Sequence, residues 1–229
     1  SGIMTVNVVR IEGRVVIRER KTGEVIQEIK NTIYANNIAE VLYDVFTNDL
    51  PPSSSTSPSI VVYEGTTQVP VPSVYNDFTW KGTLTVYQTT TINKLELYAT
   101  FNGFSFPASQ VTTSITLGQG DYTVEWIWDV DDPIGLVKDI LDYGFANNYK
   151  GYSFTGGSCT NLVTSQLYNN TVTLFFACVQ TATTTFSTYT LDFSVTNNES
   201  TTVSGTGSVD FSSKFKLAQA NTLIVPLSI

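Results

Sequence analysis

Histidine is absent from this 229-residue chain, which also has only two cysteines and one methionine. Without histidine, the chain alone cannot build a Ser-His-Asp or Cys-His catalytic arrangement. Two cysteines with no histidine also argue against a zinc site. We therefore expect a non-enzymatic protein that needs no cofactor.

Long apolar runs are missing as well. No stretch reaches the roughly 18 apolar residues of a membrane-spanning helix, so we expect no transmembrane segment. After Met4, "TVNVVRIEGRVVIRER" alternates apolar and charged residues, unlike the apolar region of a secretory signal. Because Met4 is the only methionine, we expect residues 1–3 to be a cloning remnant and translation in the host cytoplasm to begin at Met4.

Charge is scarce, because Asp, Glu, Lys and Arg make up only 14% of the chain and Thr, Ser and Asn supply most of its polar groups. Hydroxyl and amide groups do not titrate, so such a surface keeps its character in acid. Combined with cytoplasmic synthesis, this composition indicates a component of a virus particle. The net charge of −8 argues against nucleic-acid binding through phosphates.

The few basic residues are unevenly placed. All four arginines lie within the first 20 residues: Arg10, Arg14, Arg18 and Arg20. They form either a solvated face of a β-hairpin or a docking surface for an acidic partner. In a virus particle, the second interpretation makes them candidates for contact with the capsid.

Alternating polar and apolar residues predict strands along most of the chain. Segments 5–19 and 24–30 are a predicted hairpin with its turn at Thr22 and Gly23, and residues 50–59 are a predicted loop. Two further runs of strands are predicted, one from the loop to residue 130 and one from residue 151 to the end. Their spacing is typical of antiparallel sandwiches.

A helical period replaces the strand pattern in two places. The apolar positions are Ile38, Val41, Leu42 and Val45 in the first, and Ile134, Val137, Ile140 and Leu141 in the second. We expect the first helix to begin at Asn36 or Asn37 and to end near Asn48. For the second helix, Asp131 or Asp132 is the predicted cap, with Pro133 in the first turn and Gly144 at the end.

The two helices resemble each other at an offset of 99 positions. The matched pairs are Val41 and Ile140, Leu42 and Leu141, Phe46 and Phe145, and Asn48 and Asn147. The ends of the two strand runs, "ITLGQGDYTVEW" (115–126) and "FKLAQANTLIVP" (215–226), match at an offset of 100 through Leu117 with Leu217 and Gln119 with Gln219.

These matches predict a duplicated unit of helix followed by β-sandwich. The expected fold is all-β with two short helices, and its tandem antiparallel, jelly-roll-like sandwiches occupy residues 4–131 and 132–229. The alternative is a single larger sandwich with two helical decorations.

The two cysteines flank a predicted hairpin that turns near Asn169 in "LYNNTV". Residue numbers that sum to about 337–339 then face each other, which makes Cys159 and Cys178 candidates for a cross-strand disulfide. Two buried free thiols are the alternative. Asn169 and Asn198 lie in N-x-S/T sequons at predicted turns and are candidates for glycosylation.

The only acidic cluster is "DVDD" at 129–132. Its place between a strand and a helix favours capping of the helix and interaction with its dipole. Weaker alternatives are a Ca²⁺ site formed by Asp129, Asp131 and Asp132, or paired catalytic carboxylates. The aromatic "YTVEWIWDV" before it is either core packing or a sugar-stacking face.

Several weak motifs occur together in a familiar order: "GEVIQEIKNTIYANNIAEVL", "YEGTT", "GTLTVYQTTTINKLELYATFNG" and "FPASQVTTSITLGQGDYTVEW". Over residues 10–130 the chain resembles a β-sandwich module of structural proteins from tailed phages and archaeal viruses. With low charge and a second sandwich, it looks like the turret proteins of turreted icosahedral viruses of thermoacidophilic archaea, of the Sulfolobus turreted icosahedral virus type. That resemblance implies a homo-pentamer at the capsid vertex, contact with other capsid or turret proteins, and a role in host attachment.

We therefore expect a virion structural protein whose first sandwich faces the capsid and whose second faces outward. A phage-like tail or baseplate component would form trimers or hexamers instead. A carbohydrate-binding module would bind a host surface glycan as a monomer. A glycosidase that uses the acidic cluster would lose hydrolysis on Asp131→Asn.

Overall fold

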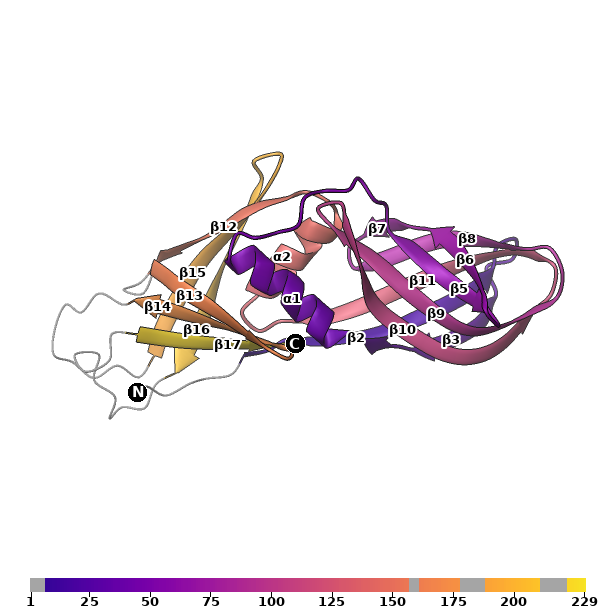
Figure 1. The fold of residues 1–229 in the computed structure, drawn as a ribbon, viewed down its shortest axis with the longest axis horizontal. Helices are drawn as coiled ribbons and strands as arrows, with labels where there is room; N and C mark the ends of the chain where they lie inside the picture. The colour runs from indigo at the N-terminus through magenta and orange to yellow at the C-terminus, as the bar shows by residue number, and fades with distance from the viewer. Residues whose placement is uncertain (1–6, 157–160, 178–187, 211–221) are drawn as a thin grey trace.

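The computed structural model describes residues 7–156, 161–177, 188–210 and 222–229. Strands dominate this part of the chain, and with two short helices they confirm the expected all-β fold. The strands form four sheets, which we name by their contents (Figure 1). Neither helix in the described ranges is long and apolar enough to cross a membrane.

The first sandwich consists of two five-stranded sheets. The arginine sheet has the order β3 (Val25–Lys30), β2 (Arg10–Glu19), β11 (Gly120–Asp131), β8 (Thr79–Val86), β7 (Val74–Asn76). The tyrosine sheet has the order β4 (Thr32–Ile33), β10 (Phe104–Leu117), β9 (Thr90–Phe101), β5 (Ser59–Glu64), β6 (Thr67–Pro72). The predicted hairpin of β2 and β3 is confirmed.

The second sandwich is smaller and includes the first described strand of the chain. The uncharged sheet has the order β1 (Asn7–Val8), β17 (Thr222–Ser228), β14 (Thr171–Ala177), β13 (Asn161–Tyr168). The three-stranded sheet has the order β12 (Tyr149–Gly156), β15 (Thr188–Asn197), β16 (Thr202–Asp210). Because β1 pairs in parallel with β17, residues near the two ends of the chain lie side by side.

Period-two burial explains why these segments form sheets. On β11, Tyr122, Val124, Trp126 and Trp128 are buried, whereas the residues between them are partly exposed. The aromatic residues of "YTVEWIWDV" therefore pack in the core, as one of the two interpretations predicts, and do not form a sugar-stacking face.

Helices α1 (Ala35–Phe46) and α2 (Leu136–Phe145) lie between the two sandwiches (Figure 1). α1 packs against β10 of the first sandwich and β13 and β14 of the second, while α2 packs against β9 and β15. The buried hydrophobic residues of both sandwiches and both helices, apart from Val16, belong to one continuous core. The molecule is therefore an elongated body in which the helices join the two sandwiches.

Both helices begin at residues other than those expected. α1 starts at Ala35, after Tyr34, without a side-chain cap, and Asn37 Nδ2 instead donates to the Pro107 carbonyl at 3.0 Å. α2 starts at Leu136, and its N-cap is Gly135 with φ 90°. Asp132 still caps the helix as predicted, although it lies three residues before the N-cap position. Its Oδ2 accepts a hydrogen bond from the Lys138 amide in the first turn at 3.0 Å.

Gly144 does not end α2 as expected. The helix continues to Phe145, and the left-handed residue after it is Asn147, with φ 56°. A Cβ on Gly144 would overlap the ring of Phe101, so glycine is needed for close packing of α2 on β9.

The strand pairing repeats after each helix. In the first unit β5 pairs with β9 and β9 with β10, while β7 pairs with β8 and β8 with β11. In the second unit β12, β15 and β16 pair in the first manner, and β13, β14 and β17 in the second. β6 has no counterpart among the described strands. This shared connectivity is what a duplicated unit predicts.

The matches at an offset of 100 depend on Leu217 and Gln219, which lie outside the described residues, but over the described part of the closing strands burial favours an offset of 99. An offset of 99 superimposes buried residues of β11 on buried residues of β17: Val124 on Leu223, Trp126 on Val225 and Trp128 on Leu227. An offset of 100 would place buried Val124 on the partly exposed Ile224. A slip of one residue exchanges the two faces of a strand, so burial selects 99, the offset of the helices.

Candidate functional site

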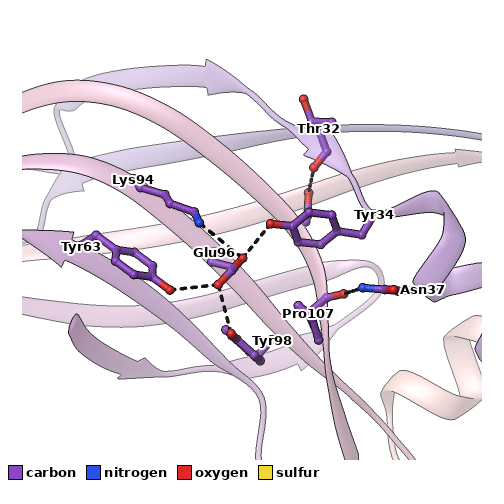
Figure 2. Close-up of polar contacts among 9 residues, drawn as sticks. Thr32, Tyr34, Asn37, Tyr63, Lys94, Glu96, Tyr98 and Pro107 are labelled. Carbon is purple, nitrogen blue, oxygen red and sulfur yellow. Dashed lines mark hydrogen bonds and ion pairs between the residues drawn. The ribbon is translucent and has the colours of Figure 1, made fainter. Parts of the chain in front are cut away.

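A buried carboxylate surrounded by tyrosines lies on the tyrosine sheet (Figure 2). Lys94, Glu96 and Tyr98 alternate along β9 and therefore share one face, and Tyr63 lies opposite Lys94 on β5. Tyr34 reaches the same face from the N-terminus of α1. Three separate segments of the chain thus meet at Glu96.

The tyrosine hydroxyls all donate to this one carboxylate. Tyr34 Oη lies 2.7 Å from Glu96 Oε2, and Tyr63 and Tyr98 Oη lie 3.0 and 3.1 Å from Oε1. Lys94 Nζ is 3.7 Å from Oε2 and 5.0 Å from the centre of the Tyr63 ring. With Glu96 only 7% exposed, the cluster satisfies a charge that would otherwise be costly to bury.

The cluster favours ionised Glu96. Burial alone would raise the pKa of Glu96, but the three hydroxyl donors and Lys94 outweigh it and hold the pKa below its ordinary value. Burial and the hydrogen bond to Glu96 raise the pKa of Tyr34. The ionised carboxylate therefore links β9 to β5 and to the residue that precedes α1, through hydrogen bonds from neutral tyrosines.

Sequence reasoning missed this cluster. The alternation in "NKLELY" (93–98) is a local signal, because it places Lys94, Glu96 and Tyr98 on the face opposite the buried Leu95 and Leu97. The other two tyrosines come from distant segments, and nothing in their local sequence connects them to Glu96.

A second feature is a hollow of about 560 Å³ beside the joint between the sandwiches, which we call the junction groove. Its lining residues are Leu50, Pro51, Ser53, Ser55, Thr56, Ser57, Asn102, Gly103, Asn147, Tyr149 and Asn198. None of them is charged, whereas the hollow beside Arg14 has Glu12, Glu28, Lys30 and Asp129 in its wall. The volume lies within the range of about 300–1,000 Å³ typical of small-molecule sites.

Two asparagines fix the wall of the junction groove. Asn147 Oδ1 accepts hydrogen bonds from the Gly103 amide at 2.8 Å and the Thr100 hydroxyl at 3.1 Å. Asn102 exchanges two hydrogen bonds with the backbone of Tyr149, at 2.8 and 3.0 Å. The groove is therefore built on backbone that is held in place from both sandwiches.

Two of the four arginines, Arg14 and Arg18, pair with acids of their own sheet. Arg14 Nε lies 3.2 Å from Glu28 and its Nη1 lies 3.4 Å from Asp129. Arg18 Nε lies 3.4 Å from Glu125. Arg10 is opposite Asp131 in the strand register, but among the described residues no ion pair of Arg10 or Arg20 is found. This arrangement supports the solvated-face interpretation, in which each exposed pair contributes little to stability.

Two residues of the acidic cluster have different partners. Asp129 pairs with Arg14, and Asp132 binds the amides of Ile134 and Lys138. Within the part of the chain that the structure describes, no group of three or more His, Cys, Asp or Glu side chains could hold a metal ion. The Ca²⁺ site considered for Asp129, Asp131 and Asp132 is therefore not formed there.

The predicted cysteine hairpin exists, although both cysteines, Cys159 and Cys178, lie outside the described residues. β13 and β14 turn at Asn169, and Leu167 faces Val172 within the expected register. Asn169 has φ 52°, and the exposed Asn198 lies in the turn between β15 and β16. Both sequon asparagines thus occupy turns, as expected.

No protein-family model matches this chain, and no curated protein or solved structure is significantly similar to it. The proposals that follow therefore depend on the geometry and on the resemblance stated above.

Proposed function

We propose that the chain is a non-enzymatic structural protein of a virus particle, part of a turret or spike at a capsid vertex. In this role it assembles as a symmetric oligomer, in contact with other capsid or turret proteins, and contributes to host attachment. The observation that carries the proposal is the continuous core that joins two sandwiches and two helices into one elongated body. A projecting virion component needs such a body to hold its outer end at a fixed position.

The two ends of the body differ in the way that this role requires. The arginine sheet carries charged residues of both signs, and it can contact a polar capsid surface even with Arg14 and Arg18 paired within the sheet. The described strands of the second sandwich have few charges and suit the exterior. Aromatic contacts hold the helices against the sandwiches. The ring centres of Phe145 in α2 and Trp80 in the first sandwich are 5.2 Å apart, and those of Phe46 in α1 and Tyr152 in the second are also 5.2 Å apart.

Solution mass tests this function. Light scattering at pH 3 and at pH 7 is expected to show a closed oligomer at both values, and five subunits would match a vertex turret. Three or six subunits would favour a phage-like tail or baseplate component. A monomer at both pH values would contradict assembly as the main function.

The junction groove favours a second candidate function, carbohydrate binding. Its hydroxyl and amide lining suits a neutral, hydroxyl-rich ligand. If the chain is a carbohydrate-binding module, a glycan array should show binding by the monomer, and Ser57→Arg, which fills the groove, should abolish that binding. Ser204→Arg, an exposed serine on β16, is the matched control. Wild-type binding by both variants would exclude the groove as the glycan site.

A further inference from the structure

The four sheets differ sharply in charge. The arginine, tyrosine and three-stranded sheets all contain charged residues, but the uncharged sheet has no Asp, Glu, Lys or Arg in any of its four strands. This sheet is also where strands from the two ends of the described chain pair. Its composition therefore distinguishes it from every other sheet in the described structure.

β13 is the longer of the two edge strands of the uncharged sheet, and among the described strands it pairs with β14 alone. It exposes large apolar side chains: Val163 is 62% exposed and Tyr168 is 79% exposed. A strand edge presents unpaired amide and carbonyl groups that can pair with another chain. β13 therefore offers both backbone hydrogen-bonding groups and apolar side chains to a partner.

Edge strands are usually protected against such pairing by charge, proline, bulges or short length, and three other edges of the described sheets show this. β6 contains Pro70 and Pro72, β3 contains Glu28 and Lys30, and β7 has only three residues. β13 has eight residues, none of them charged or proline, and one bulge at Val163 is its only protection of this kind. Its length and composition leave it the least protected of these edges.

The net charge of the chain favours a second copy as the partner of this sheet. At a net charge of −8, copies of the chain repel one another, so they approach most easily where neither surface is charged. When an uncharged strand meets an uncharged strand of a second copy, no like charges are brought together. The uncharged sheet thus satisfies the electrostatic condition for self-association.

We propose that copies of this chain associate through the uncharged sheet, with β13 pairing against a strand of the neighbouring copy. This inference rests on the proposed assembly and names its interface. A dimer would place β13 against its own counterpart, whereas a larger ring requires β13 to meet a different edge of the next copy.

The test compares lysine substitutions at two exposed valines on edge strands. Val163→Lys on β13 places a charge in the proposed interface, and Val74→Lys on β7, where Val74 is 75% exposed, is the matched control. Light scattering over a dilution series is expected to show subunit affinity weakened roughly tenfold or more by Val163→Lys and unchanged by Val74→Lys. Tyr168→Lys, at the other end of β13, should repeat the loss.

Near-ultraviolet circular dichroism of each variant checks that the fold is kept. Oligomers of wild-type size in both β13 variants would overturn the interface while leaving the proposed assembly intact. An equal loss in Val74→Lys would also overturn it. A wild-type chain that stays monomeric at every concentration would instead contradict the assembly itself.

Discussion

Asn48 and Asn147, 99 positions apart, end their helices in the same left-handed conformation, with φ 55° and 56°. The amides of each asparagine and of its two chain neighbours donate to carbonyl oxygens of the last helical turn, and the same offset relates every donor and acceptor. This is the Schellman arrangement, in which asparagine takes the place of the more usual glycine. The two asparagines differ in their side-chain contacts, because the Asn147 side chain accepts hydrogen bonds from the Thr100 hydroxyl and the Gly103 amide.

That difference predicts opposite effects for one substitution. Asn48→Gly should be neutral or stabilise by about 0.5 kcal/mol, because glycine adopts the left-handed conformation without steric cost. Asn147→Gly gains the same relief but loses two side-chain hydrogen bonds, so it should destabilise by about 1 kcal/mol. Urea unfolding of both variants measures the difference. Equal effects would mean that the Asn147 side chain does not hold the joint.

Glu96→Gln should destabilise the protein at pH 7 by about 1–3 kcal/mol, because it weakens three hydrogen bonds to a buried charge. The folded-state pKa of Glu96 lies below its ordinary value of 4.5, so the stabilisation is complete above 4.5 and is lost as the pH falls through the folded pKa. The gap between variant and wild type should therefore narrow below pH 4.5.

Chemical denaturation across pH 2–7 tests that window. Glu64→Gln on neighbouring β5 is the control, since no hydrogen bond or ion pair of the Glu64 side chain is found in the described structure. A gap that stays constant down to pH 2 would contradict the role given to the Glu96 charge.

Asp44→Asn has the opposite pH dependence. Burial, together with nearby Glu40 and Asp49, raises the pKa of Asp44 above its ordinary value of 3.8. A raised carboxyl pKa costs stability at neutral pH, and the cost disappears as acid protonates the group. Asp44→Asn should stabilise by about 0.5 kcal/mol at pH 7, in line with a like-charge pair one helical turn apart. Thermal unfolding should show the gain at pH 7 and almost none at pH 3.

The sign of the stability change in Gly144→Ala tests how closely α2 packs on β9. Helix propensity alone would stabilise the variant by about 1 kcal/mol, but a methyl group at this position overlaps the Phe101 ring. We expect destabilisation of about 1–3 kcal/mol in urea unfolding. Gly151→Ala on β12, where a methyl group meets no atom within 4 Å, is the control. A stabilised Gly144→Ala would refute the close contact.

Local patterns predicted much of this fold. Alternation located the strands of both sandwiches, the Asn169 turn set the register of β13 and β14, and helical periodicity placed the end of α1 near Asn48. The start of α1 was missed because Tyr34 precedes it without a side-chain cap. Features that depend on distant segments had no local signal. The parallel pairing of β1 with β17 involves only two residue pairs, and the partners of Glu96 come from three segments of the chain.

The account depends most on the claim that both sandwiches and both helices form one body. Differential scanning calorimetry of the full chain tests it directly, because a single cooperative unit gives equal calorimetric and van't Hoff enthalpies. We predict one transition with a ratio of these enthalpies of about one. Two resolved transitions would show that the sandwiches unfold independently, and would contradict the continuous core on which the proposed function rests.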